Sequence, residues 1–163
     1  MLKDGTPKVL VTGAVGQIGS ELVMELRGRY GGENVVAAGH KTEPGPELRD
    51  SGPFVYVYAT RPETMKEVVD EHEIDTIYHL AAILSATGEK NPQLAWRVNL
   101  NGLYTVLEIA RECEISRVFW PSSIAAFGPD TPKDNTPQET ILRPTTMYGV
   151  TKVAGELLGN YYV

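Results

Sequence analysis

Short apolar segments alternate along this chain with stretches in which apolar residues recur every three or four positions. The short segments have the length and composition of β-strands, and the longer stretches have the period of amphipathic helices. Strand and helix patterns that alternate in this way are typical of βαβ units, which build a parallel sheet. The sequence therefore predicts an α/β fold with a doubly wound parallel sheet. The predicted strands are Lys8–Thr12, Val35–Ala38, Phe54–Val57, Thr76–Leu80 and Arg117–Pro121.

Local signals locate helix ends between these strands. Thr60-Arg-Pro-Glu63 resembles a capping box at the start of a helix. Asn91-Pro92 combines an N-cap residue with a first-turn proline, and it precedes a long helix that extends to Cys113. A last helix begins near Thr146. Two segments rich in glycine or proline are predicted to be loops without regular structure, residues 39–53 and 128–144.

Composition narrows the class of protein. The formal net charge is −6 at pH 7 and no run of lysine and arginine occurs, which argues against nucleic acid as a partner. No apolar segment approaches the ~20 residues that a membrane span requires, and Met1–Pro7 lacks the pattern of a secretory signal. Cys113 is the single cysteine and cannot form an internal disulfide. These features predict a cytoplasmic domain without membrane association, and no metal site is predicted.

A glycine motif follows the first predicted strand. Thr12-Gly-Ala-Val-Gly-Gln-Ile-Gly19 connects the apolar segment that ends at Val11 to a helical stretch. At such a junction, backbone N–H groups at the helix N-terminus bind a pyrophosphate. A glycine motif by itself is weak evidence because turns need glycine, but its position between strand and helix favours dinucleotide binding. Gly13 would form the turn, Gly16 would admit the pyrophosphate, and Gly19 would let helix and strand pack closely.

A tyrosine and a lysine lie one helical turn apart near the carboxyl end, in Tyr148-Gly-Val-Thr-Lys152. This spacing puts the phenol and the ammonium on one helix face. Such pairs are common by chance, and the alternative is a packed Tyr148 with a solvated Lys152. Ser123 ends the fifth predicted strand, at the sheet edge where ligands of such folds bind. A hydroxyl, a phenol and an ammonium at this edge predict proton transfer at an alcohol.

Five predicted strands are fewer than the six or more of a complete doubly wound nucleotide fold. The fifth strand lacks the neighbour that a sixth would provide, and the last helical pattern continues to Val163. We therefore expect residues 1–163 to be one dinucleotide-binding domain, truncated after about five strands. It would be the amino-terminal half of a longer enzyme whose substrate domain is missing.

Five motifs in order resemble the extended short-chain dehydrogenase/reductase family, whose members have a Rossmann-type NAD-binding fold. The resemblance runs from Lys8 to the end of the chain, and the interval from Ser123 to Tyr148 also suits the family. Three further segments resemble the epimerase-like L-threonine 3-dehydrogenases within it. The family motifs are the glycine motif, Leu80-Ala-Ala82, Val98-Asn-Leu-Asn-Gly102, Pro121-Ser-Ser123 and Tyr148–Lys152, and the subfamily segments are Leu84–Glu89, Phe119–Ile124 and Pro144–Gly149.

The resemblance implies an enzyme that oxidises the Cβ hydroxyl of L-threonine to 2-amino-3-ketobutyrate, with hydride transfer to NAD. Tyr148 would be the base, Lys152 would hold the nicotinamide ribose and favour the phenolate, and Ser123 would orient the substrate hydroxyl. Asn99 matches an asparagine on the cofactor side of the long helix, and the alternative is a helix residue that bonds water. Ser85 matches a serine in the loop that meets the substrate, and the alternative is a serine in an ordinary turn. The implied cofactor contacts are Gly13, Gly16, Gln17, Ile18, Gly19, Leu80, Ala81, Ala82, Asn99, Tyr148 and Lys152, and the implied substrate contacts are Ser85, Ser123 and Tyr148.

The sequence departs from the family where an acid usually binds the adenosine ribose. The second predicted strand ends in Ala38-Gly-His-Lys41, and Tyr58-Ala59 stands where a second acid is usual. Without an acid and with Lys41 nearby, a 2′-phosphate is tolerated, so NADP is an alternative cofactor. If Lys41 is a solvated loop residue, NAD still binds, only more weakly. The subfamily resemblance favours NAD.

Two other functions stay open. A nucleotide-sugar epimerase or dehydratase of the same family shares the serine, tyrosine and lysine, and a non-catalytic dinucleotide-binding module needs only the glycine motif. As to partners, helices 92–113 and 146–162 have apolar residues on more than one face, more than packing on a sheet requires. The family resemblance implies a homodimer in which these helices form a four-helix bundle.

Overall fold

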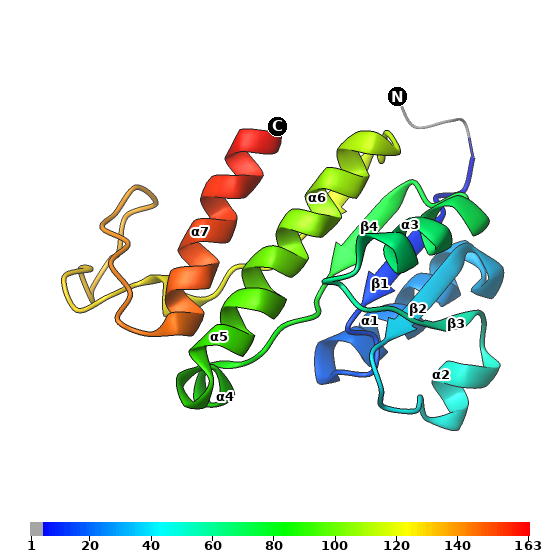
Figure 1. The fold of residues 1–163 in the computed structure, drawn as a ribbon, viewed down its shortest axis with the longest axis horizontal. Coiled ribbons are helices and arrows are strands. Elements are labelled where there is room, and N and C mark those ends of the chain that lie inside the picture. Colours follow the sequence, from blue (N-terminus) through cyan, green and yellow to red (C-terminus); the bar gives the residue numbers. More distant parts are fainter. Residues whose placement is uncertain (1–4) are drawn as a thin grey trace. The chain divides into compact units, whose positions relative to one another are not determined.

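The computed structural model describes residues 5–163, which divide into two compact units. The first, unit 1, extends to Ala81 and also includes Thr105–Trp120, and the second, unit 2, comprises Ala82–Tyr104 and Pro121–Val163. Figure 1 traces the chain from the first strand in blue to the last helix in red. Residues 1–4, which belong to the Met1–Pro7 segment that lacks the pattern of a secretory signal, lie outside the described residues.

Unit 1 is built on a parallel sheet of five strands in the order β3-β2-β1-β4-β5. The chain moves outward from β1 in both directions, which confirms the predicted doubly wound α/β fold. The register places Val9 of β1 beside Val35 of β2 and Thr76 of β4. The strands are β1 (Val9–Thr12), β2 (Val35–Gly39), β3 (Phe54–Tyr56), β4 (Thr76–His79) and β5 (Arg117–Phe119).

Helices cover both faces of this sheet because successive strand residues point to opposite sides. The helical elements of unit 1 are α1 (Gln17–Tyr30), the short turn η1 (Gly32–Asn34), α2 (Pro46–Asp50), α3 (Pro62–Glu71) and most of α6 (Gly102–Glu112). Leu10 and Ile77 belong to one apolar core with residues of α3 and α6. Val9 and Val11 belong to a second core with residues of α1 and α2. The strand ends at the carboxyl edge are therefore held from both sides.

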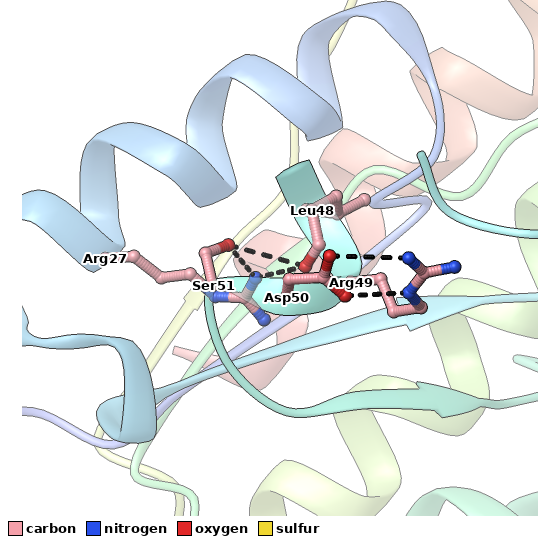
Figure 2. Close-up of polar contacts among 5 residues, drawn as sticks. All are labelled: Arg27, Leu48, Arg49, Asp50 and Ser51. Carbon is pink, nitrogen blue, oxygen red and sulfur yellow. Dashed lines mark hydrogen bonds and ion pairs between the residues drawn. The ribbon is translucent and has the colours of Figure 1, made fainter. Parts of the chain in front are cut away.

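A buried arginine joins α1 to the segment around α2. Arg27 is 5% exposed, and its guanidinium donates four hydrogen bonds. The acceptors are the carbonyl oxygens of Val35, Leu48 and Pro53 and the Ser51 hydroxyl, at 2.5–3.2 Å. Figure 2 shows Leu48 and Ser51 gathered at the guanidinium, with the Arg49–Asp50 pair nearby. These bonds organise a segment predicted as an irregular loop, so that prediction was wrong for the residues of α2.

The start of α3 also differs from its prediction. Arg61 is the N-cap residue and Pro62 the first helical residue, and in the described chain no side chain caps this end. A proline at this position needs no acceptor for an N–H group, and its fixed φ suits the first turn. The predicted capping box between Thr60 and Glu63 was therefore wrong, because the proline makes such a cap unnecessary.

Unit 2 is helical, and its longest element is α7 (Met147–Tyr162). Its other elements are α4 (Ser85–Lys90), α5 (Pro92–Ala95), the π-helical turn η2 (Trp96–Asn101), the start of α6 and the 3-10 turn η3 (Ile124–Ala126). Helix α7 packs against α4, α5, η2 and η3. Asn91 accepts a hydrogen bond from the Leu94 N–H at 3.0 Å, which confirms the predicted N-cap. The predicted long helix after it is interrupted by η2, which the apolar spacing did not indicate.

Among helices within residues 5–163, none combines the length and apolar character needed to cross a membrane. Over the same residues, no three histidine, cysteine or carboxylate side chains are grouped as a metal ion would require.

Candidate active site

The glycine motif forms the turn between β1 and α1 in unit 1. Gly13 has a φ of +72°, a conformation that residues with side chains rarely adopt. A Cβ on Gly13 would lie 2.8 Å from the Ala81 nitrogen, so the turn approaches the backbone after β4 closely. The Thr12 hydroxyl lies 2.7 Å from His79 Nδ1 and accepts a hydrogen bond from the Ala81 N–H at 3.4 Å. The loop therefore lies beside two other predicted cofactor contacts, Leu80 and Ala81.

The first turn of α1 completes this loop. Gly16 is the N-cap residue, and within residues 5–163 no side chain caps the turn. A Cβ on Gly19 would overlap the Gly13 carbonyl oxygen, so this glycine lets α1 pack against the turn. Ile18 is 71% exposed, and Gln17 is exposed as well. N–H groups without a cap at a helix N-terminus attract a phosphate, so the loop fits the pyrophosphate of a dinucleotide.

The lysine of the tyrosine–lysine pair is buried in unit 2. Lys152 is 3% exposed, and its Nζ donates a hydrogen bond to the Pro121 carbonyl oxygen at 2.7 Å. The same Nζ lies 5.5 Å from the centroid of the Tyr148 ring, within the range of a cation–π contact. Burial lowers the pKa of Lys152 to about 8. This burial contradicts the alternative in which Lys152 is a solvated surface residue.

Tyr148 and Ser123 lie on elements of unit 2 that pack together. Tyr148 is half-buried in the first turn of α7, and Ser123 caps η3 by accepting a hydrogen bond from the Ala125 N–H at 3.2 Å. A Cβ on Gly149 would overlap the Ala125 carbonyl oxygen, so the glycine after the tyrosine lets α7 approach η3. The Ser123 oxygen acts here as an acceptor, and its hydroxyl can still donate a hydrogen bond to a ligand.

Asn99 is buried in η2, where its side-chain amide bonds to the chain itself. Its Oδ1 accepts a hydrogen bond from the Ile83 N–H at 2.7 Å. Its Nδ2 donates to the Ile83 carbonyl oxygen at 2.9 Å and to the Thr151 hydroxyl at 3.3 Å. These bonds hold the segment that follows Ala82 against η2 and α7, in contrast to the alternative of a hydrated helix residue. A contact between Asn99 and a cofactor stays a prediction.

Ser85 lies at a helix end rather than in a loop. It is the exposed first residue of α4, after Leu84 as the N-cap residue. A Cβ on Gly88 would lie 3.3 Å from the Ala95 Cβ, so this glycine brings α4 close to α5 and stabilises the short helix by packing. The loop assignment of Ser85 was therefore wrong, and its contact with a substrate stays a prediction.

Two acidic residues for which the sequence predicted no role position α7. Glu89 Oε1 accepts a hydrogen bond from the Met147 N–H at 2.6 Å, which puts a negative charge at the N-terminus of α7. Glu156 accepts a hydrogen bond from the Ser122 hydroxyl. Thr146, the predicted helix start, adds an N-cap bond to the first turn at 3.0 Å. The two glutamates gave no signal in the sequence because their partners are distant along the chain.

The side chains of unit 2 are suited to proton transfer at an alcohol. The buried Lys152 ammonium lies beside the Tyr148 phenol, and this arrangement makes Tyr148 a candidate for proton transfer. The Ser123 hydroxyl could donate a hydrogen bond to the oxygen of a bound alcohol and so orient that alcohol. Unit 1, taken by itself, has a loop that fits a pyrophosphate.

Comparison with known proteins identifies the family. Residues 9–163 match the sequence profile of the NAD dependent epimerase/dehydratase family. The chain belongs to this family. The predicted extended short-chain dehydrogenase/reductase family is thereby confirmed. An uncharacterized epimerase/dehydratase of Staphylococcus saprophyticus is 54% identical over 156 residues, which cover 95% of this chain and 48% of that protein.

Solved structures of L-threonine dehydrogenases are similar to this epimerase/dehydratase chain. The enzyme from Clostridium difficile has a TM-score of 0.92 and 49% identity, over 97% of this chain and 49% of its own. A GalE-like L-threonine dehydrogenase from Cupriavidus necator, in its holo form, has a TM-score of 0.91 and 49% identity, over 96% of this chain and 50% of its own. The chain thus spans about half the length of these relatives.

Proposed function

We propose that this chain belongs to an enzyme that oxidises the Cβ hydroxyl of L-threonine to 2-amino-3-ketobutyrate. The hydride acceptor is a nicotinamide dinucleotide, NAD or its 2′-phosphate. The observation that carries the proposal is the buried Lys152 ammonium beside the Tyr148 ring, because a module that only binds a dinucleotide has no need of it. The 49% identity to L-threonine dehydrogenases supports the choice of substrate.

The proposed reaction assigns one task to each group. A bound nicotinamide dinucleotide accepts the hydride from the alcohol carbon of the substrate. Tyr148 takes the hydroxyl proton, and Ser123 donates a hydrogen bond that orients the same oxygen. The positive charge of Lys152 stabilises the Tyr148 phenolate before that proton arrives. The Gly13–Gly19 loop holds the pyrophosphate through the first-turn N–H groups of α1.

The proposal concerns an enzyme longer than this chain, because its relatives are about twice as long. Residues 1–163 are proposed as its dinucleotide-binding domain, acting in the cytoplasm. The further proposed cofactor contacts are Gln17, Ile18, Leu80, Ala81, Ala82 and Asn99, and Ser85 is a proposed substrate contact.

Turnover by the complete enzyme that contains these 163 residues, followed through the absorbance of the reduced nicotinamide, tests the proposal. We expect reduction that depends on L-threonine and that Tyr148→Phe lowers by at least about 100-fold, as loss of a general base does. The matched control is Tyr161→Phe on the same helix, because Tyr161 is 79% exposed, has no proposed task in the reaction, and keeps its apolar ring in the variant.

Two outcomes would replace the proposal. Turnover of a UDP-sugar without any response to L-threonine would support the nucleotide-sugar epimerase or dehydratase. Dinucleotide binding without turnover, unchanged by Tyr148→Phe, would support the non-catalytic module.

We also propose a homodimer formed through helices 92–113 and 146–162. Trp96 is 45% exposed, Leu157 is 65% exposed and Tyr161 is 79% exposed. Leu157 and Tyr161 lie four positions apart on α7, and exposed apolar side chains that share a helix face are typical of interfaces. Light scattering at micromolar concentration should give twice the chain mass of 17.9 kDa, and a mass of one chain would contradict the dimer.

A further inference from the structure

The end of β2 in unit 1 carries a glycine, Gly39, where an acid usually binds the ribose of NAD. Gly39 is the last residue of β2 and is buried. A Cβ there would lie 2.7 Å from Phe54 Cζ and 3.1 Å from Val15 Cγ2. A carboxylate at this position normally accepts hydrogen bonds from the adenosine ribose. Here it would displace Phe54, so the adenosine end of NAD lacks its usual partner.

Basic side chains gather at this edge instead. His40 and Lys41 follow β2, Arg61 precedes α3, and all three are exposed. The Tyr58 ring joins them, since its centroid lies 4.4 Å from that of the His40 ring and 4.7 Å from Arg61 Cζ. The position expected to hold a second acid is thus occupied by an aromatic ring that contacts two basic residues.

The edge is continuous with the glycine loop. The Ala14 N–H donates a hydrogen bond to the Ala38 carbonyl oxygen at 3.1 Å. The Val15 side chain lies against Gly39, as the Cβ distance above shows. In folds of this type, a dinucleotide with its pyrophosphate on the glycine loop extends its adenosine ribose over the end of β2. The ribose 2′ position would therefore meet the basic residues.

The positive charges of this edge are not neutralised by the chain. Across the described residues, no ion pair joins Lys41 or Arg61 to a carboxylate. Glu63 lies two positions after Arg61, but in the first turn of α3, where the helix N-terminus already stabilises its charge. Glu43 acts electrostatically on Arg49 and helps to raise the pKa of that guanidinium. The exposed basic side chains at this edge are therefore able to bind an anion.

We propose that His40, Lys41, Tyr58 and Arg61 bind the 2′-phosphate on the adenosine ribose of NADP, and that the chain binds NADP more tightly than NAD. A guanidinium presents two parallel N–H donors that match a phosphate, and Lys41 adds a second cation. The inference rests on the proposed dinucleotide function, and it reverses the cofactor preference that the family resemblance favours.

Calorimetric titration of the complete enzyme that contains these 163 residues tests the inference directly. The probes are NADP⁺ against NAD⁺, and adenosine 2′,5′-bisphosphate against adenosine 5′-monophosphate. In each pair we expect the compound with the 2′-phosphate to bind at least about tenfold more tightly, as charge-assisted hydrogen bonds to one phosphate allow. Equal or tighter binding of NAD⁺ overturns this inference and leaves the proposed oxidation intact. Failure of every probe to bind overturns both.

Charge-removing variants locate the phosphate site. Arg61→Gln and Lys41→Gln should each weaken NADP⁺ binding by about fivefold or more and leave NAD⁺ binding unchanged. Arg49→Gln is the matched control, because Arg49 is exposed in the same unit but pairs with Asp50 at 2.8 Å (Figure 2). Added salt should weaken NADP⁺ binding more than NAD⁺ binding. An equal loss for both dinucleotides in Arg61→Gln, with unfolding unchanged, would show that the edge does not distinguish the phosphate and would overturn the inference.

Discussion

Arg27 in unit 1 and Lys152 in unit 2 are both buried cations, but the chain surrounds them differently. Arg27 donates to four oxygen atoms drawn from β2 and from the segment around α2. Lys152 donates to the Pro121 carbonyl oxygen and lies beside the Tyr148 ring. Burial lowers the pKa of both, and for Lys152 it brings the value to about 8. Only the lysine therefore titrates near neutral pH.

The difference in partners and pKa indicates that Arg27 stabilises the fold, while Lys152 is suited to a role in proton transfer. A guanidinium has five donors in a fixed plane and keeps its proton, so it can join several backbone segments at once. An ammonium is compact, and its pKa shifts readily on burial. We therefore expect Arg27 to stabilise the folded chain and Lys152 to destabilise it at neutral pH.

The largest expected effect is the loss of the Arg27 cross-link. Arg27→Met removes the four hydrogen bonds that join α1 to β2 and to the segment around α2. The free energy of unfolding should fall by about 3–5 kcal/mol, measured by urea denaturation. Arg29→Met is the control, because Arg29 makes only an exposed pair with Glu25 and should change stability little. A loss no larger than that of the control would contradict the structural function of Arg27.

Lys152→Met should raise the free energy of unfolding, whereas Arg27→Met lowers it. The folded lysine has a pKa of about 8 against an ordinary value of 10.5, so burial of its charge costs about 3 kcal/mol below pH 8. Loss of the bond to Pro121 offsets about 1 kcal/mol, and a net gain of about 2 kcal/mol is expected at pH 7.

The pH dependence of this gain sharpens the comparison. Between pH 8 and 10.5 the unfolded lysine holds its proton while the folded one has lost it, so the wild-type chain becomes more stable as pH rises. The advantage of Lys152→Met should therefore disappear by about pH 10. Denaturation curves at several pH values would reveal this, and an advantage independent of pH would show that burial of charge is not its cause.

Asn99 is the residue of unit 2 that corresponds most closely to Arg27. Asn99→Ala removes both hydrogen bonds to the Ile83 backbone and the bond to Thr151. We expect a loss of about 2 kcal/mol, with the exchange of the Ile83 amide hydrogen accelerated. An unchanged exchange rate at Ile83 would indicate that the segment is held by other contacts.

The smallest changes in the free energy of unfolding are expected for glycine-to-alanine variants in one helix of each unit, away from the buried cations. Gly28 in α1 and Gly159 in α7 have open space where a Cβ would stand. Alanine at either position should raise the free energy of unfolding by about 0.5 kcal/mol, because the unfolded chain loses flexibility. Thermal unfolding of both variants would measure this, and a destabilisation at Gly159 alone would show that its surface is not open in solution.

The fold could be predicted from the sequence wherever the signal is local. The apolar segments from Val9 and Val35 predicted strands to within two residues, because a strand buried on both faces is apolar throughout. The Asn91 cap and the helix start at Thr146 were predicted because the side chain and its backbone partner are three residues apart. The family motifs around Tyr148 and the glycine loop were recognised for the same reason.

Contacts between distant residues were not predictable. Helix α2 depends on Arg27, which lies 21 residues before Leu48. The link from Glu89 to the start of α7 spans 58 residues. Pairings of this kind depend on the folded arrangement, and no local pattern indicates which glutamate will meet which N–H group. The same limit applies to the His40–Tyr58–Arg61 cluster, whose members are brought together by β2, β3 and α3.

The π-helical turn η2 makes this part of the chain sensitive to insertion and deletion. Such a turn contains one residue more than an α-helical turn, and Asn99 lies within it. Deleting a single residue from Trp96–Asn101 would return the turn to regular α-helical hydrogen bonding and change the directions of the side chains within it. The asparagine would then no longer face Ile83. A relative one residue shorter between Asn91 and Gly102 should accordingly hold that segment by a different side chain.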